Sequence, residues 1–382
     1  MSMPAALRRR LDYSGPPLFS YGFRPFFLGG ALWAALAVVL WLPQYFGEMG
    51  LPTAFGALDW HIHEMIYGYL AAVITGFLLT AIPNWTGRLP INGYPLATLF
   101  GLWLAGRIAI VGSAIWGLWL AAAIDVAFLV LLAAAAAREL IAGNVVFHAE
   151  VIAYGAADYG IRLGIAAIVV LISLIGGRIV PSFTHNWLAR SNPGRMPQSF
   201  SRFDTVAVTG TALALAAWIV LPQSSVSGAL LMIAGVLQAV RLIRWAGDRT
   251  AADRLVLVLH VAYAFVPLGL LLAGAAISWP AAWPISAGLH AWMSGAAGLM
   301  TLAVMTRASL AHTGNKLIAT ISTELIYLCA LTAALTRIAA AFAPSSALLH
   351  TAAAAWVLAF GGFALVYGPL LVGRAPVWAG RS

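Results

Sequence analysis

One apolar segment, Trp60–Ala81, sets the frame for the chain because it is long enough to cross a bilayer as a helix. A bilayer core of about 30 Å needs roughly 20 apolar residues at the rise of an α-helix. Pro83 ends the segment, and His61, His63 and Glu64 stand at its start. The segment therefore predicts a transmembrane helix that carries titratable side chains at one end.

Similar apolar segments recur along the chain and indicate its fold class. Of the 382 residues, 62% are hydrophobic and 9% are charged, which excludes an ordinary soluble protein. We predict an all-α protein, a polytopic transmembrane helical bundle of about twelve spans. The predicted spans lie near 25–45, 61–81, 94–116, 118–137, 144–157, 159–180, 203–221, 226–245, 253–277, 284–306, 317–341 and 348–371.

The distribution of cations predicts the orientation of these spans. With the N-terminus in the cytoplasm, all but three of the 21 lysines and arginines fall at the inner face, as the positive-inside rule requires. Both termini are therefore predicted to be cytoplasmic. The net charge of +9 follows from this arrangement, so no nucleic-acid partner is expected. We predict a single integral membrane domain, 1–382, in a lipid bilayer, with a cytoplasmic arm at 1–23 and a central cytoplasmic loop at 184–202.

Two interpretations fit the titratable groups at the start of the second span, which are His61, His63 and Glu64. They can sit in the wet interfacial layer, with Trp60 as an aromatic anchor. Three such groups within four positions favour a function, because intramembrane ionisable groups usually face a cavity, a cofactor or a partner, and imidazole is the commonest metal ligand. On an ideal helix His61 and His63 point about 200° apart, so both bind one centre only if the first turn is unwound.

A second stretch, Leu289–Asn315, repeats part of this pattern. A glycine follows five residues, and a threonine 23 residues, after both His63 and His290. Chance competes with this echo, because glycine and threonine are common in membrane helices. Both spans run from outside to inside, so we expect His63 and His290, with His61, to converge in the outer leaflet.

The remaining histidines, apart from His185 in the central loop, fall into two groups. His260 and His312 are predicted nearer the cytoplasmic side, where a hydrogen bond to a neighbouring helix or simple solvation is the alternative to ligation. His148 and His350 lie near span ends or in otherwise bland helices, and we interpret them as structural.

Two arginines in the outer halves of their spans, Arg107 and Arg337, have no acid nearby in the sequence. A buried arginine needs an anionic partner. We expect them either to meet Glu64 or Asp125 from other helices or to hold the propionates of a buried haem, since guanidinium binds carboxylate bidentately. The single cysteine, Cys329, excludes a cysteine-based metal cluster and covalent c-type haem attachment.

Motifs along nearly the whole chain resemble the NnrS family of haem- and copper-containing bacterial membrane proteins. They are FRPFF, WHIHEMIYGY, GFLLTAIPNWTG, LWLAGR, GGRIVPSFT, HVAYAFVPLG and LHAWMSGAAGLMTLAVMTRASLAHTG. The resemblance implies a twelve-helix protein of the bacterial inner membrane that helps cells to survive nitrosative stress, often encoded with denitrification functions. It also implies metal or haem ligands at His61, His63, His260, His290 and His312. With no covalent attachment motif the haem is expected to be haem b, with copper as the further metal.

The resulting expectation is a membrane protein that acts on nitric oxide, with reduction to nitrous oxide as the leading mechanism and electrons from quinol or an external donor. Glu64, Glu324 and Tyr327 are the candidates for proton delivery, and Glu324 has hydrogen bonding to neighbouring threonines as its alternative role. Non-catalytic binding or sensing of nitric oxide by haem fits the histidines equally well. A transporter also fits twelve spans around a central loop, but it explains clustered histidines poorly.

Overall fold

The computed structural model describes residues 13–86, 90–132, 148–151, 153 and 158–373, and these contain helices and no strand. Ten helical segments in this part of the chain are long and apolar enough to span a membrane. The polytopic helical fold is thereby confirmed. The ten agree with the predicted spans except the fourth and fifth: residues 118–128 form a shorter apolar helix, and most of 144–157 lies outside the described residues. The count of twelve stays a prediction, as does the orientation of the termini.

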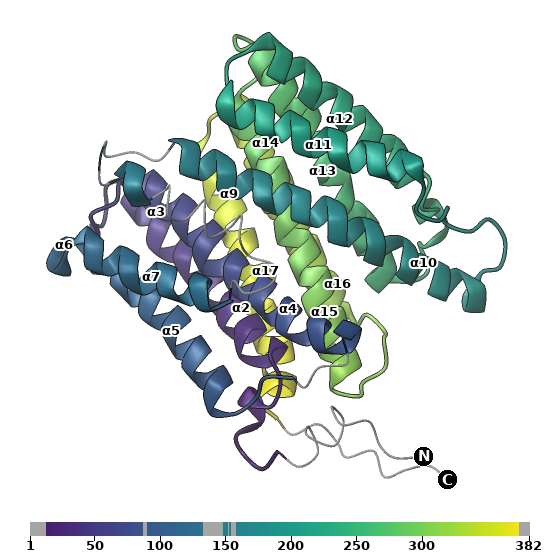
Figure 1. Cartoon of the computed structure of the whole chain (residues 1–382), viewed down its shortest axis with the longest axis horizontal. Helices are drawn as coiled ribbons and strands as arrows, with labels where there is room; N and C mark the ends of the chain where they lie inside the picture. Colours follow the sequence, from purple (N-terminus) through teal and green to yellow (C-terminus); the bar gives the residue numbers. More distant parts are fainter. Residues whose placement is uncertain (1–12, 87–89, 133–147, 152, 154–157, 374–382) are drawn as a thin grey trace. The chain divides into compact units, whose positions relative to one another are not determined.

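The chain divides into two compact units that interleave along the sequence (Figure 1). Unit 1 comprises residues 1–161, 305–316 and 360–382, and unit 2 comprises 162–304 and 317–359.

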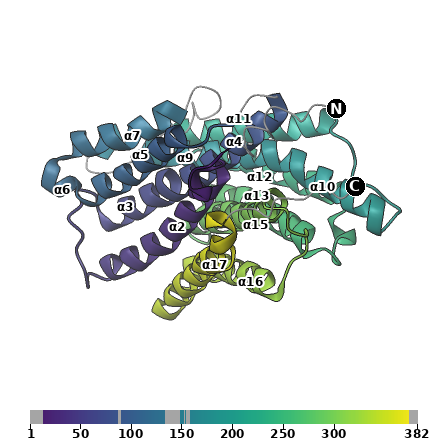
Figure 2. The ribbon, with the colours of Figure 1, turned by 90° about the horizontal axis from the view of Figure 1, so that it is seen from below.

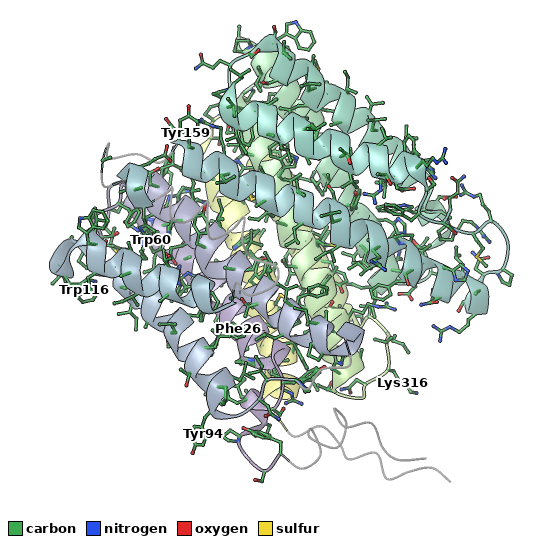
Figure 3. The ribbon with its side chains drawn as sticks, in the orientation of Figure 1. Phe26, Trp60, Tyr94, Trp116, Tyr159 and Lys316 are labelled. Atoms are coloured by element: carbon green, nitrogen blue, oxygen red, sulfur yellow. The ribbon has the colours of Figure 1, made fainter. Side chains whose placement is uncertain are left out.

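Unit 1 contains the N-terminal helices. They are η1 (Pro17–Phe19), α2 (Phe23–Tyr45), α3 (Ala57–His63), the π-helix η2 (Glu64–Leu70), α4 (Ala71–Thr86), α5 (Tyr94–Val111), α6 (Ser113–Trp116), α7 (Leu118–Leu132) and the first turn of α9 (Asp158–Leu171). The helix α2 packs along α3, η2 and α4, and α5 packs along α7. Bulky buried side chains such as Phe26 and Trp103 fill the space between them. Tyr94, the first residue of α5, projects outward (Figure 3).

Unit 2 contains most of the C-terminal helices. They are the π-helix η3 (Ile172–Gly176), α10 (Gly177–Ser191), α11 (Arg202–Val220), α12 (Ser225–Ile243), η4 (Gly247–Arg249), α13 (Arg254–Ser278), α14 (Ile285–His290), the π-helix η5 (Ala291–Leu299), the start of α15 (Met300–His312), α16 (Ile321–Phe342) and the first half of α17 (Ser346–Val372). The helix α13 packs against α12, α14 and η5, and Figure 2 shows α12 and α13 side by side. Because it touches so many neighbours, α13 is mostly buried.

Helix ends in unit 2 follow local side-chain chemistry. Asp253 accepts hydrogen bonds from the first N–H groups of α13, and Ser201 and Asp204 form a capping box at the start of α11. The helix α10 extends to Ser191, so residues 184–191 are helical, contrary to the loop that the sequence predicts at 184–202. A polar sequence does not end a helix by itself. Here the helix ends just before Pro193, whose ring disfavours helical backbone at the preceding residue.

Candidate metal centre

Three elements of unit 1 bring His63, Asp125 and His148 together. His63 is the last residue of α3, Asp125 lies on α7, and His148 lies in the helical residues 148–151. The chain passes from α3 into the π-helix η2 directly after His63. A π-helical turn holds one residue more than an α-helical one and often marks a functional site. The sequence thus delivers His63 at a point where the helix changes its winding.

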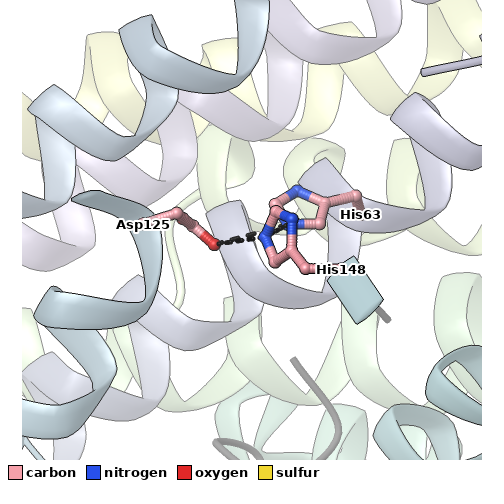
Figure 4. A group of neighbouring side chains, drawn as sticks. All are labelled: His63, Asp125 and His148. Carbon is pink, nitrogen blue, oxygen red and sulfur yellow. Dashed lines mark hydrogen bonds and ion pairs between the residues drawn. The ribbon is translucent and has the colours of Figure 1, made fainter. Parts of the chain in front are cut away.

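The three side chains point toward one another (Figure 4). Nε2 of His63 and Nε2 of His148 are 3.3 Å apart, and each lies 3.4 Å from Oδ2 of Asp125. Two ligands on one tetrahedral ion, bonded at about 2.0–2.1 Å, lie about 3.3 Å apart. The exposed fractions are 0% for His63, 1% for Asp125 and 3% for His148. The three groups can therefore ligate one metal ion, and their spacing already suits it.

Carboxylates and an arginine surround this triangle. Nδ1 of His63 lies 3.0 Å from Oε1 of Glu64, and Arg107 donates to Oε2 of Glu64 at 2.7 Å and to Oδ1 of Asp125. The indole N–H of Trp33 also donates to Oε2 of Glu64, at 2.6 Å. With its proton on Nδ1 facing Glu64, His63 presents the Nε2 lone pair toward the triangle, as ligating histidines do. Two carboxylates against one guanidinium leave a net negative charge, which favours a bound cation.

Aromatic rings close the site against water. The ring centroid of Phe55 lies 5.5 Å from that of His63 and 5.7 Å from that of His148. The ring of Tyr67 lies 5.3 Å from that of His63. Charges in such a dry environment interact strongly, so the ion pairs of Arg107 hold the carboxylates in place.

The other predicted histidine ligands of unit 1 lie elsewhere. His61 stacks on Trp41 with ring centroids 4.1 Å apart, and α3 continues through both His61 and His63 without unwinding. His312 packs against the rings of Tyr21 and Phe23 at 5.6 and 5.4 Å. Neither belongs to the group of possible ligands around His63 found in the described part of the chain.

Two predicted ligands belong to unit 2. Nε2 of His260 lies 2.7 Å from Oγ1 of Thr184, whose hydroxyl donates to the carbonyl of Val180, so His260 is the donor. Nδ1 of His290 donates to the carbonyl of Ser286 at 2.6 Å, which leaves Nε2 of this ring with its lone pair. The convergence of His290 with His63 stays a prediction.

The predicted proton carriers differ in their surroundings. Glu64 is 0% exposed and bound to three side chains, as described above. Glu324 lies in the first turn of α16, about half exposed, with Oε1 3.8 Å from Nε of Arg254. Tyr327, one turn later on α16, is buried.

Sequence reasoning found part of this site and missed part of it. The expectation that Arg107 meets Glu64 or Asp125 is confirmed, because it pairs with both. The sequence indicates only a structural role for His148, and the structure places it at one corner of the triangle. The spacing of His148 from the other ligands, 85 residues from His63, gives no local signal for this role.

Fold and site together define a polytopic helical membrane protein with a buried histidine and carboxylate cluster. The family model described as NnrS protein matches residues 17–374, nearly the whole chain. The chain therefore belongs to the NnrS family, and this membership supports a membrane protein of the nitric oxide response. A comparison with curated proteins gives no match.

Proposed function

We propose that this NnrS protein acts on nitric oxide at a buried metal centre in unit 1, held by His63, Asp125 and His148. One observation carries the proposal: the ligand atoms of these three side chains lie within 4.8 Å of one another in a dry interior. The carboxylates of Asp125 and Glu64 share the single guanidinium of Arg107, so a bound cation would balance the remaining buried negative charge. Family membership supplies the connection with nitric oxide.

The donor set suits particular metals. Two imidazoles and one carboxylate are compatible with iron, copper or zinc, and of these iron and copper change oxidation state under cellular conditions. We propose copper or non-haem iron at this centre. We propose a haem b group separately, which Nε2 of His290 would hold. Its ring is oriented by the Ser286 carbonyl, and Arg337 lies within electrostatic reach of His290, so its guanidinium would be the group to hold a haem propionate.

The remaining histidines, His61, His260 and His312, stay candidate ligands by family resemblance. Nδ1 of His260 fits this role, because it is buried and has no hydrogen-bond partner among the described residues. A buried ring nitrogen without a hydrogen-bond partner costs free energy unless an ion, a cofactor or a water molecule binds it.

The leading reaction is reduction of nitric oxide: two molecules, two electrons and two protons give nitrous oxide and water. The redox metal supplies electron transfer to nitric oxide when bound. The residues hold the ion, exclude water and keep a proton on Nδ1 of His63 through Glu64. We assign proton delivery to Glu64 at this centre and to Glu324 and Tyr327 in unit 2. Electrons come from quinol or another external donor, and the protein lies in the bacterial inner membrane.

A second candidate function, capture of nitric oxide without turnover, is favoured by the burial of all three ligands. Nitric oxide is small and uncharged, so it reaches a dry site that excludes charged substrates. Only the formation of nitrous oxide distinguishes reduction from binding of nitric oxide.

The test is metal analysis of the detergent-purified protein, with optical and electron paramagnetic resonance spectra before and after nitric oxide, and an assay of nitrous oxide with a quinol donor. His63→Ala, Asp125→Asn and His148→Ala should each lose the metal of this centre. The matched control is His350→Ala, because His350 is exposed and should leave the metal content unchanged.

Three results distinguish the candidate functions. Nitrous oxide formation that depends on His148 supports reduction. A nitric oxide spectrum without product supports capture. A wild-type protein that contains neither iron nor copper overturns both, and the transporter alternative then leads.

A further inference from the structure

The helical stretch that carries His148 is fastened to the start of α9 by Glu150. One carboxylate oxygen of Glu150 accepts the backbone N–H of Tyr159 at 2.9 Å, and the other accepts that of Gly160 at 2.7 Å. The first N–H groups of a helix have no acceptor within the helix, and the positive end of the helix dipole favours a carboxylate there. Glu150 thus holds His148, two residues away, at a fixed place relative to the first turn of α9.

The same residue of α9 is held from the side of His63. The hydroxyl of Tyr67 donates to the carbonyl of Gly160 at 3.1 Å. Tyr67 lies in η2, four residues after His63, and its ring packs on the His63 imidazole. Tyr67 and Gly160 are both buried, so water does not compete for this hydrogen bond.

We infer that Glu150 and Tyr67 are positioning residues of the metal centre, which set the separation of His148 and His63 by binding the N–H and the C=O of Gly160. The inference rests on the proposed metal centre. Neither residue supplies a ligand atom to the triangle of His63, Asp125 and His148. Their effect passes through Gly160, because the two histidines come from segments that are distant in sequence.

The link through Gly160 matters because one metal ion accepts only a small range of distances between the two imidazoles. The Nε2 atoms are 3.3 Å apart, which is about the distance that one tetrahedral ion requires. A shift of the 148–151 stretch by a fraction of an ångström lengthens one metal bond. Residues that orient metal ligands in this indirect way typically change metal affinity by about 10–100-fold when they are replaced.

The experiment uses the full chain in detergent, stripped of metal and titrated with Co²⁺, whose visible absorption bands report coordination geometry. Tyr67→Phe removes one hydroxyl, and Glu150→Gln keeps the shape of the side chain but removes one acceptor. The controls are Tyr94→Phe and Glu48→Gln, because both side chains are exposed. We expect each test variant to bind Co²⁺ about 10–100-fold more weakly, with shifted absorption bands. The controls should match the wild type.

Two further measurements distinguish a positioning role from a general effect on stability. Melting temperatures of the four variants should stay close to that of the wild type, and the double variant should lose less affinity than the product of the two single losses, since both act on Gly160. Test variants that fold and bind Co²⁺ with wild-type affinity and spectrum overturn the positioning role while the metal centre stands. A wild-type protein that does not bind Co²⁺ overturns the proposed centre itself.

Discussion

Two π-helical segments, one in each unit, begin directly after a histidine. In unit 1, η2 starts at Glu64 after His63, and in unit 2, η5 starts at Ala291 after His290. The two follow the echo seen in the sequence, in which a glycine and a threonine stand at equal distances from each histidine. The same backbone device thus presents an imidazole in both units.

The surroundings of the two rings differ. His63 faces Glu64, Asp125 and His148, whereas His290 donates to a backbone carbonyl and lies within electrostatic reach of Arg337. One ring sits among acids that favour a cation, and the other keeps a lone pair beside a cation that suits an anionic partner. The winding of the helix presents the histidine, and the neighbouring side chains decide what it can bind.

The largest expected effect separates the two histidines by the centre that each serves. His63→Ala should remove nearly all of the metal bound in unit 1 and leave the haem spectrum in place, because its ligand triangle is broken. His290→Ala should do the reverse. Metal analysis and optical spectra of the two purified variants check this, and a single variant that loses both signals would show that the two residues serve one centre.

Arg107→Leu should destabilise the protein by about 3–5 kcal/mol, because it removes the guanidinium that pairs with the buried carboxylates of Glu64 and Asp125. Unfolding in detergent measures the loss. The control is Arg195→Leu, since Arg195 and Asp248 form an exposed pair whose loss should cost less than about 1 kcal/mol. Equal losses in the two variants would contradict the importance of the buried pairs.

Gly68→Ala should cost about 1–3 kcal/mol and lower the metal content, because the added methyl group overpacks the ion pair. Its Cβ would lie 2.7 Å from both Nη1 of Arg107 and Oε2 of Glu64. Gly101→Ala is the matched control, since nothing lies within 4 Å of a Cβ at that helical position. Thermal unfolding and metal analysis of both variants test the expectation, which a harmless Gly68→Ala would contradict.

The smallest expected effect concerns His260 in unit 2. Thr184→Val removes the acceptor of the Nε2 proton of His260 and should cost about 1 kcal/mol. Thr351→Val, an exposed helical threonine, should change stability by less than about 0.5 kcal/mol. Denaturant unfolding compares them, and a Thr184→Val protein as stable as the control would show that another group satisfies His260.

Much of the fold is predictable because the bilayer requires it. Apolar length gives the spans, and the bounds of α2, α11 and α13 lie within two residues of those predicted. The site is less predictable. His63, Glu64 and Arg107 stand out as ionisable groups in apolar segments, and their pairing follows from the need of a buried arginine for an acid.

Two features of the site have no local signal in the sequence. His148 lies in a stretch whose sequence has no metal-ligand spacing, and the packing of the described helices brings it to Asp125. The sequence also gives no signal for the π-helical winding of η2, η3 and η5, because the residues in these segments are ordinary helix residues. Tertiary contacts, more than local preference, select this winding.

The winding of η2 has a consequence for how such a site arises and how it is lost. A π-helical turn is equivalent to one residue inserted into an α-helix, so a single codon separates the two forms of the second span. Deleting one residue within 64–70 would restore regular winding and turn His63 by about 100° relative to α4. A single in-frame deletion would thus carry the imidazole away from its partners while the span kept enough length to cross the membrane.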